Sequence, residues 1–239
     1  MKTCVEVVAR RGPGGRTVLP VVRGSGQLAV RRTGPTSVHL VATAFGPLGG
    51  DDATIRLVVE EGATLAVHSV AAAVALPARD ADRPSVQRIV AEVAGVLDLR
   101  PEPSVVTARA HHVAELAVEL AGGAELTAVE QVLLGRTGEE PGRWTGTTRI
   151  TRDGAPLLHT TTALGPGAPA WAGPFTPRAY ASTVHLGTGG TGGTGADAVR
   201  LPLPGGWVAT AWGERLHRVV ASLDELDPRT TPTGAAAAG

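Results

Sequence analysis

Apolar and polar residues alternate with a period of two along much of the chain, and this pattern predicts β-strands. Between Ala53 and Glu60, aliphatic residues occupy every second position and most positions between them are polar. Because successive side chains of a strand point to opposite faces, this segment has one face for a core and one for water. The longer segment from Val106 to Leu120 has the same pattern and is predicted as a second strand.

Glycine-containing turns recur about every 30 residues, at 61–63, 94–95 and 122–124. Each turn joins an alternating strand with acidic residues to a second apolar strand. Such a repeat indicates stacked strand–turn–strand units in a β-helix-like or sandwich arrangement. The Asp153-Gly154 pair, which tolerates positive φ, predicts a hairpin between two further strands.

Helical spacing is rare and is clearest near the C-terminus, where five aliphatic residues form one stripe: Leu216, Val219, Val220, Leu223 and Leu226. The predicted fold is mostly β, with β-helix-like stacked strands and hairpins and a few short helices, including a C-terminal one. We expect residues 1–228 to form a single β-rich domain. We expect residues 229–239, which end in AAAAG, to be a disordered tail.

Composition excludes several classes of function. Lys plus Arg equals Asp plus Glu at 22 each, so the chain has no excess positive charge to gather nucleic acid. One cysteine cannot form an internal disulfide, and the N-terminal stretch is polar and strand-like, which together predict a cytoplasmic protein. No stretch is apolar for long enough to predict a membrane span.

A glycine-rich segment, Phe45 to Asp52, lies between two predicted strands. Phosphate-binding loops require a helix after the glycines, whereas a strand follows here and no lysine accompanies the glycines. The segment is therefore interpreted as a tight connection between strands, with Asp51 capping the turn.

Histidines are numerous but do not cluster in the sequence. His111 and His112 are adjacent, so on a strand they point to opposite faces and cannot easily hold one ion. The other five histidines are scattered, without the spacing of a structural zinc site.

Glu130 shares its strand parity with Leu126, Val132 and other apolar residues. A buried carboxylate requires a partner or a wet cavity. If the face of Gln131 is the buried one instead, Glu130 is simply exposed. The sequence leaves both orientations open.

Several of these features, in order along the chain, resemble the UreD (UreH) family of urease accessory proteins. The order of the motifs is more specific than any one of them. They are GPLGGD at Gly46 to Asp51, EEGATL at Glu60 to Leu65, LDLRPEP at Leu97 to Pro103, the turn from Leu120 to Leu126, Leu134-Gly135-Arg136 with Gly138-Glu139, TRITRDGAPLL at Thr148 to Leu158, and Gly205 to Leu223.

The resemblance implies a non-enzymatic scaffold that binds UreF and, through it, the GTPase UreG, and that docks on apo-urease for nickel insertion. It also implies an internal polar channel through which Ni²⁺ passes transiently, with no tightly bound cofactor. Borderline cations accept carboxylate ligands. By position within the matched motifs, the candidate channel carboxylates are Asp51, Glu102, Glu130 and Glu139.

Two other functions compete with this interpretation. A β-solenoid carbohydrate-binding or carbohydrate-active protein would require aromatic platforms, whereas only 3% of the residues are aromatic. A purely structural assembly protein without metal traffic would differ from a nickel scaffold in whether its complex binds nickel.

Overall fold

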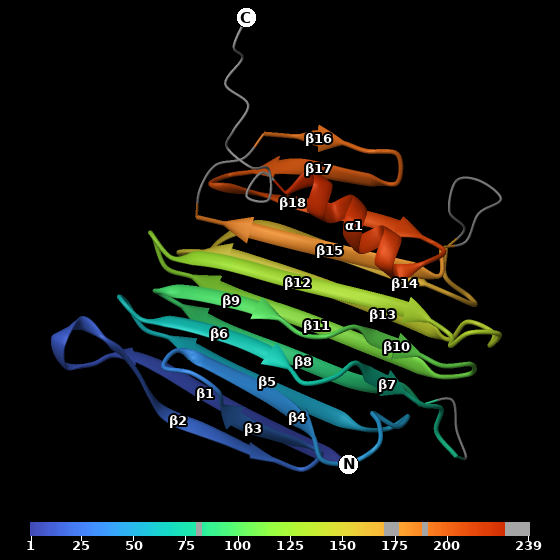
Figure 1. Cartoon of the computed structure of the whole chain (residues 1–239), viewed down its shortest axis with the longest axis horizontal. Helices are drawn as coiled ribbons and strands as arrows, with labels where there is room; N and C mark the ends of the chain where they lie inside the picture. The colour runs from blue at the N-terminus through green and yellow to red at the C-terminus, as the bar shows by residue number, and fades with distance from the viewer. Residues whose placement is uncertain (80–82, 170–176, 188–190, 228–239) are drawn as a thin grey trace, which may run out of the picture.

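Two β-sheets lie face to face and enclose the core (Figure 1). The structure, a computed structural model, describes residues 1–79, 83–169, 177–187 and 191–227. In spatial order, the first sheet contains β14 (Ala155–Leu164), β13 (Arg143–Arg152), β11 (His111–Leu120), β8 (Ser85–Val93), β5 (Asp52–Val59), β1 (Lys2–Arg11) and β2 (Thr17–Ser25).

The second sheet contains β16 (Gly193–Thr194), β17 (Ala198–Leu203), β18 (Gly206–Gly213), β15 (Ala179–Leu186), β12 (Glu125–Leu134), β9 (Val96–Arg100), β6 (Thr64–Ser69), β4 (Ser37–Ala42) and β3 (Leu28–Arg32). Two short strands, β7 (Ala73–Ala75) and β10 (Ser104–Val106), pair with each other, and β10 also pairs with β12. A short 3-10 helix, η1, spans Pro13–Gly15, and the α-helix α1 spans Leu216–Leu226.

The recurring turns stack on one another, which confirms the β-helix-like arrangement. At these turns the chain passes from the first sheet to the second, through β5–β6, β8–β9 and β11–β12. At the turns, Val96 N–H donates to Ala63 O at 2.9 Å and Glu125 N–H donates to Gly95 O at 2.9 Å. Strands of successive units are parallel neighbours within each sheet.

Alternating aliphatic side chains from both sheets form the core. Ile55 and Leu57 of β5 in the first sheet are fully buried, and so are Leu65 and Leu97 in the second sheet. Burying one such side chain contributes about 1.5–3 kcal/mol, so this layer is the main source of stability. A second apolar cluster, which includes Trp144, lies toward the other end of the strands.

The segment Val106 to Leu120 is not one strand, contrary to the sequence prediction. The chain turns between β10 and β11, where Ala110 N–H donates to Thr107 O at 3.0 Å. Arg109 adopts a positive φ of 61° there. Period-2 alternation continues through this turn, so the pattern alone did not reveal it.

The predicted hairpin and the C-terminal helix are confirmed. Asp153 and Gly154, with φ of 49° and 77°, connect β13 to β14. Helix α1 lies against the second sheet (Figure 1), where Val219 and Leu223 are buried among alanines and Trp207. No helix in the described residues is long and apolar enough to cross a membrane. The expected tail at 229–239 lies outside the described residues.

Candidate functional site

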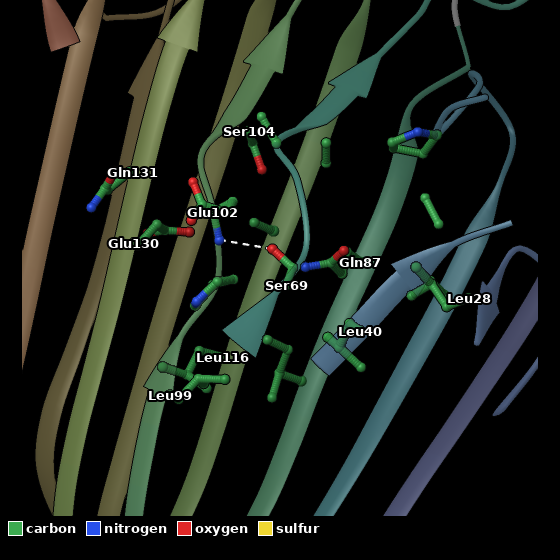
Figure 2. Close-up of a pocket in the computed structure, with 18 of the residues that line it drawn as sticks. Leu28, Leu40, Ser69, Gln87, Leu99, Glu102, Ser104, Leu116, Glu130 and Gln131 are labelled. Carbon is green, nitrogen blue, oxygen red and sulfur yellow. Dashed lines mark hydrogen bonds between the residues drawn. The ribbon is translucent and has the colours of Figure 1, made fainter. Parts of the chain in front are cut away.

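A cavity of about 150 Å³ lies between the two sheets, between the large apolar cluster and the cluster around Trp144. Side chains from both sheets line it (Figure 2). Its exposed rim is formed by the connections after β4 and β6, at Ala42, Ala44, Ala71 and Ala72, and by Glu102. The cavity thus leads from the surface toward the middle of the molecule and has room for several water molecules.

Small inward-facing residues explain why this space is left unfilled. Thr3, Ala53, Gln87, Ala114 and Gly146 are register neighbours across the first sheet, so their side chains form one row on its inner face. The row on one side carries aliphatic residues such as Ile55 and Ile89, whereas the row on the other side carries Ser85, His112 and Trp144. Apart from Gln87, this row holds only threonine, alanine and glycine. These short residues cannot span the roughly 10 Å between packed sheets, so a gap remains.

Glu130 faces the cavity, which decides between the two orientations that the sequence left open. Its parity neighbours Leu126 and Val132 are buried, and Figure 2 shows Glu130 pointing into the cavity while Gln131 points away. Burial raises the pKa of the Glu130 carboxyl from 4.5 to about 7. About half of the Glu130 carboxyl groups are therefore ionised at neutral pH, and a nearby cation would stabilise the ionised form.

Polar groups next to Glu130 add to the cavity wall. Ser182 of β15 is its register partner, and the Cβ position of Gly146 would lie 3.2 Å from Glu130 Oε2. A side chain at Gly146 would also meet the Trp144 ring at 2.2 Å, so only glycine leaves room for both neighbours. The inner end of the cavity is thus shaped around this carboxylate.

Glu102 is exposed at the rim of the cavity. Its backbone N–H donates to Ser69 Oγ at 2.8 Å, which fixes the segment between β9 and β10 against the end of β6 (Figure 2). The side chain itself is left in contact with solvent. It is therefore placed to meet a cation at the entrance.

Asp51 also borders the cavity but is held by neighbouring donors. Its Oδ2 accepts from Leu48 N–H at 2.8 Å and from Gln27 Nε2 at 2.9 Å, and its Oδ1 accepts from the Met1 ammonium. Burial acts to raise the pKa of Asp51, but these hydrogen bonds outweigh it and the pKa is lowered. The bond to Leu48 confirms that Asp51 caps the glycine-rich turn.

Glu139 is not among the residues that line the cavity. It pairs with Arg136, with 2.9 Å between Oε2 and Nε and 3.1 Å between Oε1 and Nη2. The Arg136 side chain and backbone N–H lower the pKa of Glu139 to about 2. The structure therefore brings Asp51, Glu102 and Glu130 to one cavity and places Glu139 in a loop ion pair.

The cavity also contains polar residues that sequence reasoning missed. Gln87, Thr148 and Ser182 line it, each at an inward position of a strand. Polar residues at inward parity were the available signal, because a core position rarely holds a glutamine without a partner. The polar groups that line the cavity offer carboxylate, hydroxyl and amide oxygens as ligands, and such oxygens suit a weakly held, partly hydrated divalent cation.

His111 and His112 point to opposite faces, as predicted. His112 is 2% exposed and its Nδ1 lies 2.9 Å from Ser85 Oγ. Burial, with a smaller contribution from His111, lowers the pKa of His112 to about 4, so its imidazole is neutral in the folded protein. Within the described residues, no three His, Cys, Asp or Glu side chains form a metal-binding group.

Comparison with known proteins gives a consistent result. The model of the family described as UreD urease accessory protein matches residues 2–222. A urease accessory protein UreD of Streptomyces coelicolor is 40% identical over 181 residues, which are 73% of this chain and 71% of the relative. UreD of Streptomyces avermitilis is 39% identical over 175 residues, or 70% and 69% of the two chains. UreD 1 of Saccharopolyspora erythraea is 42% identical over 133 residues, or 55% and 52%.

Proposed function

Because the chain belongs to the UreD family of urease accessory proteins, we propose that it is a non-enzymatic scaffold for urease maturation. In this role it acts with UreF and UreG in the cytoplasm to insert nickel into apo-urease. Its relatives are named as accessory proteins of urease, which supports a role in assembling that enzyme. The scaffold itself has no tightly bound cofactor and carries Ni²⁺ only in transit.

The observation that carries the nickel proposal is the half-buried Glu130 side chain, with its raised pKa, in a cavity whose rim holds Glu102. A carboxyl with a pKa near 7 can exchange its proton for a cation at neutral pH with little change in net charge. Two separated carboxylates with water between them bind nickel weakly. Weak binding allows release to the next protein.

The proposed metal path is narrower than the set of four acids expected from the sequence. Glu102 and Glu130 are the proposed nickel contacts. Asp51 has its oxygens engaged in the glycine-rich turn, and Glu139 is paired with Arg136 outside the cavity lining. We propose that these two acids act by holding loops in place.

The partner surface is proposed at the rim of the cavity. Phe45, Leu48 and Val70 are 94%, 42% and 62% exposed. In the chain, Phe45 and Val70 adjoin the rim residues Ala44 and Ala71, and Leu48 adjoins Pro47, which also lines the cavity. Exposed large apolar side chains next to a cavity are typical of protein interaction sites. Docking of UreF or apo-urease there would join the cavity to the partner without exposing nickel to solvent.

The test is reconstitution with all the components. The tagged chain is co-expressed with UreF, UreG and apo-urease from one source, followed by pull-down and by nickel-dependent urease activation with and without the chain. Co-purification with UreF and activation that depends on the chain are expected. If the chain bound neither UreF nor urease and activation was indifferent to it, the scaffold function would be wrong.

The nickel path is tested separately with Glu102→Gln/Glu130→Gln, which keeps the side-chain shapes. This variant is expected to retain UreF binding but to lower urease activation. Glu92→Gln, on the outer face of β8, is the matched control and should activate normally. Normal activation by the double variant would remove these carboxylates from the path, while leaving the scaffold function intact. Reduced activation by Glu139→Gln with an unchanged unfolding midpoint and retained UreF binding would argue against its purely structural role.

A carbohydrate-binding function is the alternative from the sequence. Sugar recognition would require several exposed aromatic rings, whereas Phe45 is the only exposed aromatic side chain among the described residues. No observation favours this alternative over urease maturation.

A further inference from the structure

Two histidines lie side by side on adjacent parallel strands of the second sheet, outside the cavity. His39 of β4 and His68 of β6 are register partners, and these strands are neighbours in the front layer of Figure 1. Their ring centroids are 5.2 Å apart and the ring planes are tilted by 34°. Because Leu40 and Val67 next to them in the chain are buried, the two imidazoles are on the outer face of the sheet.

A hydroxyl group orients the ring of His39. Thr33 Oγ1 lies 2.8 Å from His39 Nδ1 and 3.3 Å from Ser37 Oγ. When the Thr33 hydroxyl donates to Ser37, it accepts from Nδ1–H of His39, and the lone pair of the imidazole is then on Nε2. Metal-binding histidines are held in this way, with the non-ligating nitrogen donating to an oxygen that fixes the tautomer.

The spacing of the rings suits chelation of one ion. Zinc binds imidazole nitrogen at about 2.0–2.1 Å, so the ion lies about 3.2 Å from each ring centroid. Two such rings at a tetrahedral angle have centroids about 5.2 Å apart, whereas a right angle, as in octahedral coordination, brings them to about 4.5 Å. The observed 5.2 Å equals the separation that tetrahedral coordination requires when the Nε2 atoms of both rings point at the ion.

We propose that His39 and His68 form a surface site for a borderline divalent transition-metal ion, with Zn²⁺ fitting best. Only two protein ligands are involved, because no group of three ligand residues occurs in the described part of the chain; water completes the coordination. This site is on the outer face of the sheet and does not depend on the proposed role in urease maturation.

Flanking charges limit the strength of the site. Arg31 and Arg100 are the register partners of His39 and His68 on the outer sides of the pair. Arg100 Nε is paired with Asp98 Oδ1 at 2.7 Å, which neutralises part of this charge. The site is consequently expected to bind its metal reversibly, at micromolar rather than nanomolar concentrations.

The experiment is titration of the full chain with Zn²⁺ against a chromophoric chelator, with Cys4→Ser as the background to remove the free thiol. One saturable Zn²⁺ is expected, and His39→Ala or His68→Ala should each abolish it. Thr33→Val should weaken it by about tenfold, because the tautomer of His39 is no longer fixed.

Matched controls separate this site from others. His159→Ala and His217→Ala, which remove single exposed histidines, and Glu92→Gln on the outer face of the first sheet should leave Zn²⁺ binding unchanged. Equal binding by the parent and by His39→Ala/His68→Ala would overturn the proposal, as would loss of the saturable Zn²⁺ in His159→Ala or His217→Ala. Thermal unfolding of each variant without metal verifies that the substitutions leave the fold intact.

Discussion

At the scale of the residue, Glu130 combines a structural cost with a proposed role. Its side chain is half-buried and lines the cavity, and loss of hydration there raises the pKa of its carboxyl to about 7. Between its unfolded pKa of 4.5 and this value, the folded state binds more protons than the unfolded state. Stability contributed by this group is therefore greatest below about pH 4.5 and is lost as the pH rises to about 7.

Replacing Glu130 with glutamine should remove this pH dependence. Relative to the parent, Glu130→Gln is expected to gain stability between pH 4.5 and 8, by at most about 3 kcal/mol because water in the cavity offsets part of the cost. Urea unfolding at several pH values measures the difference. The exposed control Glu92→Gln should show the same pH dependence of the free energy of unfolding as the parent. The same pH dependence in Glu130→Gln would contradict the raised pKa of Glu130.

At the scale of the element, stacking of the turns holds successive units in register. At Gly95 a Cβ atom would lie 2.1 Å from Ala63 O and 2.6 Å from Glu60 O. The backbone of one turn thus fills the space that a side chain on the next turn would need. This close approach allows the hydrogen bond from Val96 N–H to Ala63 O.

Gly95→Ala should consequently destabilise the protein more than a substitution at the neighbouring turn. We expect a loss of about 2–3 kcal/mol, since the clash is with backbone atoms that cannot rotate away. Gly123→Ala is the control: its φ of +81° is strained for alanine but no atom lies within 4 Å of its Cβ, so about 1 kcal/mol is expected. Unfolding midpoints in urea give both values, and equal losses would refute the stacking argument.

The outer face of the first sheet is covered by ion pairs between adjacent strands. Glu6 pairs with Arg23 and Arg56, and Arg56 also pairs with Glu92. Exposed pairs contribute little to stability individually. Their alternating charges keep a broad flat sheet from associating with another sheet.

At the scale of the whole molecule, the apolar rim and the charged sheet face predict where partners bind. Replacing Phe45, Leu48 and Val70 with serine should weaken co-purification with UreF or apo-urease. Because these side chains are exposed, the unfolding midpoint should change little. Serine substitution of exposed Val90 on the first sheet is the control and should leave binding unchanged. Unaltered pull-down by the triple variant would exclude the rim as the docking surface.

The amino-acid sequence by itself determined the elements and the family. Period-2 alternation defined most strands, Asp153-Gly154 defined the hairpin, and the stripe from Leu216 to Leu226 defined α1, because each depends on contacts between residues close in the chain. The repeated turns indicated stacking because they recur at a regular spacing along the chain. Alternation did not reveal the turn before His111, since the turn preserves the parity of the flanking residues.

Tertiary structure alone decided which side chains share a site. The inward face of Glu130 depends on which side of β12 meets the first sheet. The cavity depends on residues from five strands forming one row, in which all but Gln87 are small. Asp51 and Glu139 are separated from the proposed metal path by hydrogen bonds that no spacing encodes. His39 and His68 are distant in sequence and meet because β4 pairs with β6. Register between strands is set by the packing of the whole core, which the local pattern does not contain.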